Sequence, residues 1–328
     1  FILPEILLEA LARHVPDAET TIIKGSWPVT PFADIGEVHE AEGDEDELIR
    51  ALEGCEVAFV HASPFTEKVI AAAAPTLKLI TVGRGGPVNI NLDAAKKHGV
   101  TVSNAPGRNA TATAEHSVAM ILASVRQLVD RHNELVAGQW RGDYYAYENV
   151  APEVRGSTVG LIGYGAIGSR VARTLHAMGA QVLAYDPYVA AADMPDAEKL
   201  EDLDELLRRS TILTLHPRLN DETRGMIGRD QLALLPEGAI VVNCSRPPVL
   251  DYDALADALD SGHLYAAAAD VLPSEPLPSG HRLLHTPRLI VTPHLAGASR
   301  ESAQLAAELG AADIARWLAG EPLKYALT

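Results

Sequence analysis

The sequence has few cysteines, and it lacks any long apolar run. Only two cysteines, Cys55 and Cys244, occur among its 328 residues. Two cysteines cannot build a disulfide framework, and they fit a protein of the reducing cytoplasm. No run of 18 or more apolar residues is present, so we expect no transmembrane helix. The first residues include neither a Met nor a basic segment, so we expect a chain observed from inside its reading frame rather than a signal peptide.

Basic side chains are also scarce relative to acidic ones. The 27 Lys and Arg residues against 44 Asp and Glu residues give a formal net charge of −17. This balance disfavours nonspecific binding to nucleic acid or to an anionic membrane, and we expect neither partner. It leaves an anionic substrate possible, because a site needs only a few local cations. Hydrophobic residues make up 47% of the chain, which is typical of a globular protein, and the length suits about two domains.

The most informative segment is the glycine-rich run Gly163-Tyr164-Gly165-Ala166-Ile167-Gly168. It follows the apolar residues 158–162 and precedes a helical stripe, so the pattern predicts a strand, a glycine turn and a helix start. The first glycine permits the tight turn, the second lets a pyrophosphate approach the backbone, and the third lets helix and strand pack closely. Free N–H groups at the helix start suit phosphates. An ordinary glycine-rich turn is the weaker alternative.

An acidic residue closes the strand that follows this helix. Asp186 lies 18 residues past Gly168, directly after the expected strand 181–185. At that position a carboxylate accepts hydrogen bonds from an adenosine ribose and repels a 2′-phosphate. The sequence therefore predicts NAD as the cofactor in preference to NADP. It suggests no metal site.

Strands alternate with helices along the chain, which predicts a parallel α/β fold in two lobes. We expect one long helix over 112–132, connecting the lobes, and a last helix over 301–318 that packs through Leu305, Ile314 and Leu318. The second lobe would be the dinucleotide-binding sheet. The first would be a smaller sheet, completed by the last helix if the chain crosses back.

Polar residues follow directly after the expected strands of the second lobe. These are Asp186, His216-Pro217, Asn243-Cys244-Ser245-Arg246, Asp270 and Pro293-His294. In an open parallel sheet, ligands bind outside the carboxyl ends of the strands. Five separate segments are therefore expected to converge at one edge of this sheet.

Three residues in these segments suit hydride transfer to or from a carbonyl group. His294 can exchange the hydroxyl proton, because imidazole titrates near neutral pH. Glu275, in a loop between prolines, is the candidate carboxylate that would orient it and raise its pKa. Arg246 can hold a substrate carboxylate and polarise the carbonyl. Taken singly, each has a plainer alternative: a structural histidine, a solvated glutamate and a surface arginine.

The sequence resembles the D-isomer-specific 2-hydroxyacid dehydrogenase family, which includes phosphoglycerate, glycerate and formate dehydrogenases. The likeness covers most of the chain and is clearest from residue 77 to residue 297. The segments that carry it are Asn104-Ala105-Pro106-Gly107-Arg108-Asn109 with Ala114-Glu115, the glycine turn with Asp186, Asn243-Cys244-Ser245-Arg246, Asp270-Val271-Leu272-Pro273-Ser274-Glu275-Pro276-Leu277, and Thr292-Pro293-His294-Leu295-Ala296-Gly297.

The resemblance implies an NAD-binding Rossmann domain over 105–295, inserted in a smaller flavodoxin-like substrate domain formed by 1–104 and 296–328. It implies Arg246, Glu275 and His294 as the catalytic residues, and homodimers formed through the NAD-binding domains. It also implies NAD contacts from Tyr164, Ala166, Ile167, His216, Pro217, Cys244, Asp270, His294 and Gly297.

The loop that binds substrate in this family departs from its usual pattern here. Aligned without gaps, Val82 stands at the usual arginine and Arg84 at the first usual glycine, while Gly86 and Asn89 are kept. The expected substrate-binding residues are Arg84, Gly85, Gly86, Asn89 and Arg246. Pro87 removes one backbone donor from the loop, and Pro247-Pro248 stiffens the turn after Arg246.

Arg84 adds a cation to that loop. We hypothesise that it recognises a further anionic or polyhydroxy group, as in a phosphorylated or sugar-derived acid such as 3-phosphoglycerate. The alternative is that Arg84 faces solvent or pairs with a nearby acid. The predicted function is an NAD-dependent oxidoreductase acting on a D-2-hydroxyacid and its 2-keto acid. A nonenzymatic NAD(H)-sensing scaffold of the same fold is the alternative.

Overall fold

The computed structural model describes residues 1–27, 29–30 and 32–328, and it divides the chain into two compact units. Unit 1 comprises Phe1–Asn109 and Ala298–Thr328, and unit 2 comprises Ala110–Gly297. These divisions lie a few residues from the predicted domain limits at 104/105 and 295/296. Within the described residues, no helix is long and apolar enough to cross a bilayer.

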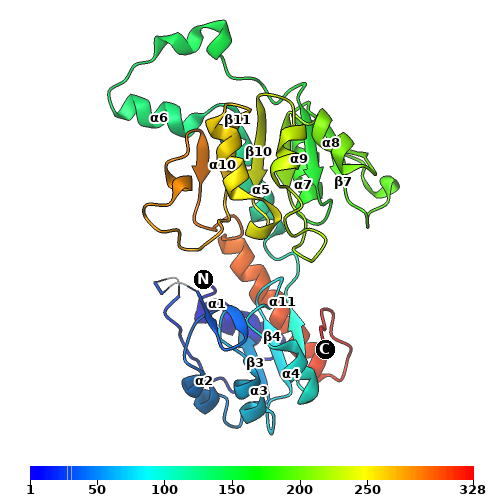
Figure 1. Ribbon diagram of the computed structural model, residues 1–328. Helices are drawn as coiled ribbons and strands as arrows, with labels where there is room; N and C mark the ends of the chain where they lie inside the picture. The colour runs from blue at the N-terminus through cyan, green and yellow to red at the C-terminus, as the bar shows by residue number, and fades with distance from the viewer. Residues whose placement is uncertain (28, 31) are drawn as a thin grey trace. The chain divides into compact units, whose positions relative to one another are not determined.

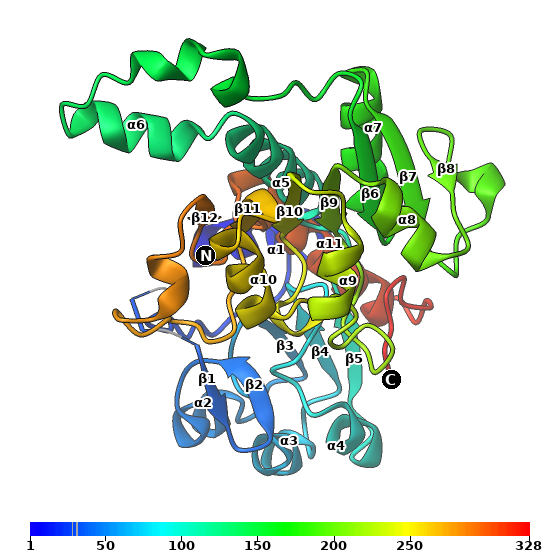
Figure 2. The ribbon, with the colours of Figure 1, turned by 45° about the horizontal axis from the view of Figure 1, so that its top comes forward.

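Unit 2 is built on a parallel sheet of seven strands in the order β12-β11-β10-β9-β6-β7-β8 (Figure 1 and, with every strand labelled, Figure 2). The strand order reverses at β6, and this reversal is the switch point of a doubly wound fold. The strands are β6 (Thr158–Ile162), β7 (Gln181–Tyr185), β8 (Glu198–Lys199), β9 (Ile212–Leu215), β10 (Ala239–Asn243), β11 (Leu264–Ala269) and β12 (Leu289–Val291). The central strands are buried on both sides, as their continuous apolar runs require.

Helices cover both faces of this sheet and form two apolar cores. On one face, α5 (Ala110–Val125) and α7 (Gly168–Ala177) pack through Ile121, Val171 and Leu175. On the other face lie α8 (Leu203–Arg209), α9 (Arg229–Leu234) and α10 (Tyr252–Asp260). Short 3-10 turns occur at Gly142–Tyr145, Tyr147–Asn149, Ala191–Asp193, Pro247–Val249 and Arg282–Leu284. The sheet edge that carries the strand ends is therefore held between two packed layers.

Unit 1 is a smaller α/β unit. Its parallel sheet has the order β3-β4-β5, formed by β3 (Val57–Val60), β4 (Leu79–Val82) and β5 (Thr101–Asn104), beside the antiparallel pair β1 (Ala33–Ile35) and β2 (Val38–Ala41). The helices are α1 (Pro4–His14), α2 (Glu45–Ala51), α3 (Glu67–Ala73), α4 (Leu92–Lys97) and α11 (Arg300–Leu318). Helices α2, α3 and α4 share one core with the strands, and the last helix packs against β4 and β5. The predicted α/β class is confirmed for both units.

The expected single helix over 112–132 is wrong, because the structure has two helices there. Helix α5 ends at Val125, and α6 (Leu128–Val136) begins after Gln127, which adopts a left-handed φ of 48°. A left-handed residue cannot continue an α-helix, so the chain changes direction. Helix α6 then extends away from the sheet of unit 2, as both views show (Figure 2).

The expected packing face of the last helix is also partly wrong. Ile314 is buried, but Leu305 and Leu318 are 43% and 53% exposed. The buried face instead consists mainly of small residues: Ser302, Ala303, Ala306, Ala307, Gly310 and Ala311. Small side chains let α11 approach the strands closely, since a Cβ built at Gly310 would lie 2.3 Å from the ring of Phe59.

Gly310→Val is expected to lower the free energy of unfolding of unit 1 by about 1–3 kcal/mol, the usual cost of overpacking a core. The matched control is Gln304→Val, on the exposed side of the same helix. Urea denaturation followed by circular dichroism compares the two variants. Equal effects of both substitutions would contradict close packing at Gly310.

Candidate active site

The glycine turn has the geometry that a bound pyrophosphate needs. Gly163 has a left-handed φ of 90°, and a Cβ there would lie 2.7 Å from the backbone of His216. A Cβ at Gly168 would lie 2.0 Å from the carbonyl oxygen of Gly163, so helix α7 sits tightly on β6. Nothing lies within 4 Å of a Cβ at Gly165. The middle glycine therefore leaves open space at the start of α7, where a phosphate can approach the backbone.

Asp186 is held by two backbone donors at the end of β7. Its Oδ2 accepts from the N–H of Tyr164 at 2.8 Å, and its Oδ1 accepts from the N–H of Tyr188 at 2.9 Å. The first of these bonds ties the carboxylate to the glycine turn. Carboxylate oxygens accept more than one hydrogen bond each, so Asp186 can also receive ribose hydroxyls.

Two further strand ends carry side chains that stay neutral. His216, after β9, shares a hydrogen bond of 2.9 Å with the hydroxyl of Thr214, and burial lowers its pKa to about 3. Cys244, after β10, is buried, and burial raises the pKa of its thiol to about 12. A thiol this reluctant to ionise is not a nucleophile. Both side chains are therefore uncharged at neutral pH.

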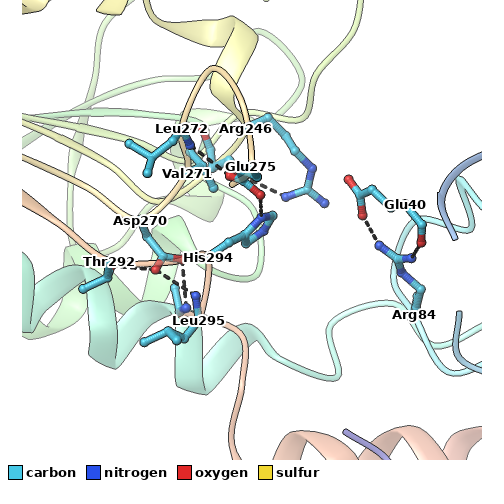
Figure 3. Close-up of polar contacts among 12 residues, drawn as sticks. Glu40, Arg84, Arg246, Asp270, Val271, Leu272, Glu275, Thr292, His294 and Leu295 are labelled. Atoms are coloured by element: carbon cyan, nitrogen blue, oxygen red, sulfur yellow. Dashed lines mark hydrogen bonds and ion pairs between the residues drawn. The ribbon is translucent and has the colours of Figure 1, made fainter. Parts of the chain in front are cut away.

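Asp270 organises the loop that follows β12 (Figure 3). Its side chain is 1% exposed and accepts from the Thr292 hydroxyl at 2.7 Å. It also accepts from the backbone N–H groups of Leu295 at 2.9 Å and Ala296 at 2.8 Å. The carbonyl of Asp270 accepts from the N–H of His294 at 2.8 Å. The turn at His294 is therefore fastened to the end of β11 on both sides.

His294 and Glu275 form an ion pair at this edge. The Nδ1 of His294 lies 2.7 Å from Oε2 of Glu275, and Oε1 of Glu275 accepts from the N–H of Leu272 at 2.9 Å. His294 itself adopts a left-handed φ of 53°. The hydrogen bond to Glu275 raises the pKa of His294, although burial opposes this. The pair thus fixes one imidazole nitrogen and leaves Nε2 for a substrate.

Arg246 stands beside this pair on an exposed turn after β10. Asn243 builds the turn: its side-chain amide donates to the Arg246 carbonyl at 3.2 Å and to the Tyr252 hydroxyl at 3.1 Å. The guanidinium donates to the Ser245 carbonyl at 2.8 Å. Its charge is close enough to oppose the protonation of His294. Figure 3 shows the side chains of Arg246, Glu275 and His294 grouped together.

The predicted substrate loop lies in unit 1, and Arg84 there is bound to an acid. Its guanidinium forms an ion pair with Glu40 and donates to the Glu40 carbonyl at 3.0 Å (Figure 3). The side chain is only 12% exposed. This arrangement corresponds to the alternative in which Arg84 pairs with a nearby acid.

The other predicted residues of this loop are fastened to neighbouring segments. Asn89 is buried, and its side-chain amide donates to the Ser63 carbonyl at 2.9 Å. The Gly85 carbonyl accepts from the side chain of Asn104 at 2.8 Å. Gly86 has open space around the position of a Cβ. The hydrogen bond of Asn89 therefore links this loop to the Ser63 segment within unit 1.

Two further side chains, His116 and Glu40, contact these residues and are not predicted from the sequence. His116 on α5 places Nε2 3.2 Å from the Thr292 hydroxyl and 3.6 Å from Asp270. Glu40 lies 44 positions before Arg84 in the sequence. No local pattern marks either residue, because each contact joins segments far apart in the chain. The residues described also contain no group of three His, Cys, Asp or Glu side chains placed to hold a metal ion.

The strand ends of unit 2 lie in a region of the chain that matches a known protein family. Residues 118–296 match the D-isomer specific 2-hydroxyacid dehydrogenase, NAD binding domain. The match spans the glycine turn, Asp186, Arg246, Asp270, Glu275 and His294. This chain belongs to the D-isomer specific 2-hydroxyacid dehydrogenase family. The predicted family is confirmed, and unit 2 contains its NAD-binding domain.

Curated relatives of this 2-hydroxyacid dehydrogenase family carry several different names. A D-3-phosphoglycerate dehydrogenase of Mycobacterium leprae is 38% identical over 89% of this chain and 55% of its own length. A glyoxylate reductase of Thermofilum pendens is 33% identical over 95% of this chain and 91% of its own. The chain spans about half the length of the phosphoglycerate dehydrogenases that it matches.

The fold is shared with solved members of the family. A D-lactate dehydrogenase of Lactobacillus jensenii, solved with NAD+, is 29% identical with a TM-score of 0.76, and the match covers 87% of this chain and 88% of that one. The expected cofactor, NAD, is supported by the matched domain and by this neighbour. The open space at Gly165 and the anchored carboxylate of Asp186 fit that group.

Glu275→Gln is expected to lower the pKa of His294, because it removes the charge that favours the imidazolium and leaves burial to dominate. In the unaltered protein, His294 should titrate above its ordinary value of about 6.5. A raised folded-state pKa stabilises the protein below the unfolded-state pKa, and this stabilisation is lost as pH rises through the folded-state pKa.

Titration of the histidine ring signals by NMR measures this shift. Glu205→Gln, on the exposed surface of α8, is the matched control and should leave His294 unchanged. A His294 pKa that is the same in both variants would refute the coupling.

Proposed function

We propose that this protein is an NAD-dependent oxidoreductase that interconverts a D-2-hydroxyacid and its 2-keto acid. The observation that carries the proposal is the His294–Glu275 pair beside Arg246, at the strand-end edge of an NAD-binding sheet. A histidine paired with a carboxylate is suited to general acid–base catalysis near neutral pH. The two relatives described above are named a dehydrogenase and a reductase, and these names agree with this class.

Each residue of the trio Arg246, Glu275 and His294 receives one role. NAD, when bound, supplies or accepts the hydride at C2 of the acid. Arg246 binds the substrate carboxylate and polarises the adjacent carbonyl. During reduction, Nε2 of His294 donates a proton to the carbonyl oxygen, and during oxidation it removes the hydroxyl proton. Glu275 holds the ring by Nδ1 and stabilises the imidazolium.

The glycine turn, the strand ends and the loop of unit 1 receive binding roles in the same proposal. Gly163, Gly165 and Gly168 cradle the pyrophosphate, and Asp186 binds the ribose and disfavours a 2′-phosphate. Residues 216, 217, 244, 270 and 297 contribute the remaining NAD contacts. The loop of Arg84, Gly85, Gly86 and Asn89 recognises the acid. The proposed acid carries a further anionic or polyhydroxy group, as 3-phosphoglycerate does.

His294→Asn is expected to lower kcat by roughly 10²–10⁴-fold, because it removes the proton-transferring group. The assay follows NADH absorbance with a panel of 2-keto acids that includes phosphorylated and sugar-derived ones. His285→Asn, an exposed histidine of the same unit, is the control and should keep full activity. Tight NADH binding with no turnover on any acid would instead support the nonenzymatic sensor.

We also propose that two copies associate through the segment of residues 126–150, here called the arm. The arm contains α6 and exposes large apolar side chains: Trp140 is 85% exposed, Tyr145 93% and Tyr147 95%. Exposed aromatic groups of this density are typical of an interface. The arm belongs to unit 2, which agrees with the dimers that the family resemblance implies.

Replacing Trp140, Tyr145 and Tyr147 together by Ser is expected to convert a dimer into a monomer, because it removes the apolar surface that the partner would cover. Sedimentation equilibrium at micromolar concentration measures the mass. Tyr188→Ser, a comparably exposed tyrosine outside the arm, is the control. An unaltered protein that sediments as a monomer would refute the arm as a dimer contact.

A further inference from the structure

A second arginine in unit 1 lies close to Arg84. Arg108 follows β5, and the two segments are joined where the N–H of Ala105 donates to the Arg84 carbonyl at 2.9 Å. The positive charge of Arg84 contributes to a lowered pKa at Arg108, after burial. The positive charges of the two guanidinium groups therefore repel each other.

The Arg108 side chain is buried in part, and two of its three nitrogen atoms have no hydrogen-bond partner among the described residues. Its Nε and Nη1 are inaccessible to solvent and have no partner in the described part of the chain. The guanidinium carbon lies 5.3 Å from the centre of the Phe1 ring. Burial lowers the pKa of Arg108 to about 10. A cation buried without a counter-ion is costly, so such a position is unusual unless an anion binds there.

His61, at the end of β3, belongs to the same group of side chains. Its Nδ1 is buried without a partner among the described residues. Burial, followed by the charges of Arg108 and Arg84, lowers the pKa of His61 to about 3. Its ring centre lies 5.7 Å from that of Phe1, whose ring also contacts Arg108. Glu40 is an acid of this region, and it is bound to Arg84.

We propose that Arg108, with Arg84 and His61 beside it, forms an anion-binding site for a phosphate or carboxylate group. A guanidinium presents paired N–H donors that match the oxygens of both groups. Arg84 is fixed by Glu40 and adds positive potential, while Arg108 supplies the unsatisfied donors. A bound oxyanion would satisfy those donors and offset the repulsion between the two arginines.

The identity of the ligand rests on the proposed function. The site at Arg108 takes the acid group that is remote from the reacting carbon, so the substrate class is a 2-hydroxy or 2-keto acid with two anionic groups. Arg108, rather than Arg84 alone, becomes the residue that selects such acids over acids with one charge.

The test compares pairs of keto acids that differ by one anionic group. Hydroxypyruvate is paired with 3-phosphohydroxypyruvate, and 2-oxopentanoate with 2-oxoglutarate. Arg108→Met is expected to lower kcat/KM for the doubly charged member of the preferred pair by about 100-fold, and to change the singly charged member less than about threefold. The preferred pair is the one whose doubly charged member has the higher kcat/KM. A preference for 3-phosphohydroxypyruvate indicates a phosphate site, and a preference for 2-oxoglutarate indicates a carboxylate site. The exposed Arg50→Met is the matched control in unit 1.

A second measurement is independent of catalysis. Without anions, Arg108→Met should melt at a higher temperature than the unaltered protein, because it removes an uncompensated buried charge. Inorganic phosphate should raise the melting temperature of the unaltered protein more than that of the variant. If no keto acid is turned over and this phosphate effect is present, the proposed function fails and the anion site stands.

Two results would overturn the anion site. One is an equal loss of kcat/KM for both members of each pair. The other is a lower melting temperature in Arg108→Met with the selectivity unchanged, which would make Arg108 a structural residue. In both cases turnover that depends on His294 would leave the proposed function intact.

Discussion

The buried carboxylate of Asp270 is the constraint on which the candidate site depends. It follows β11, the strand next to the edge strand β12 of the parallel sheet, and it accepts hydrogen bonds from the Thr292 hydroxyl and from the N–H groups of Leu295 and Ala296. These donors lie in the segment that follows the last strand, β12, and their hydrogen bonds to Asp270 hold that segment in place. A buried carboxylate needs such donors, and buried N–H groups need an acceptor, so each side of the contact requires the other.

The same anchor explains how His294 and Glu275 are brought together. His294 is held in a left-handed turn by the Asp270 carbonyl, and Glu275 is held by the N–H of Leu272, two residues after Asp270. Both members of the pair are thus positioned from the end of one strand. In the proposed reaction, a pair fixed in this way needs no rearrangement of its own before it exchanges a proton with the substrate.

The strand-end residues could be predicted from sequence because each depends on local pattern. A glycine turn or a polar residue that directly follows a strand must lie at the carboxyl end of that strand in a parallel sheet. This placement can be made without knowing which distant segments are in contact. The break at Gln127 was not predictable, since the apolar spacing continues through it. The buried face of α11 is also not predictable in this way, because it consists mainly of Ser, Ala and Gly rather than of large side chains such as Leu305.

Contacts between distant segments account for the rest. Arg84 was identified as an added cation, but its ion pair with Glu40 joins β2 to the loop after β4 and leaves no trace in either segment. The unpartnered donors of Arg108 are likewise a property of the packed unit. Sequence pattern locates charged residues well, and only the packed structure shows which charges are compensated.

The most direct test of the central claim is to follow hydride transfer itself. NADH that carries deuterium at both hydrogen positions of C4 is incubated with the protein and an accepted 2-keto acid, and the product is analysed by mass spectrometry. The account predicts that the label appears at C2 of the D-hydroxyacid. A hydroxyacid without the label, or no product with any acid, would contradict it.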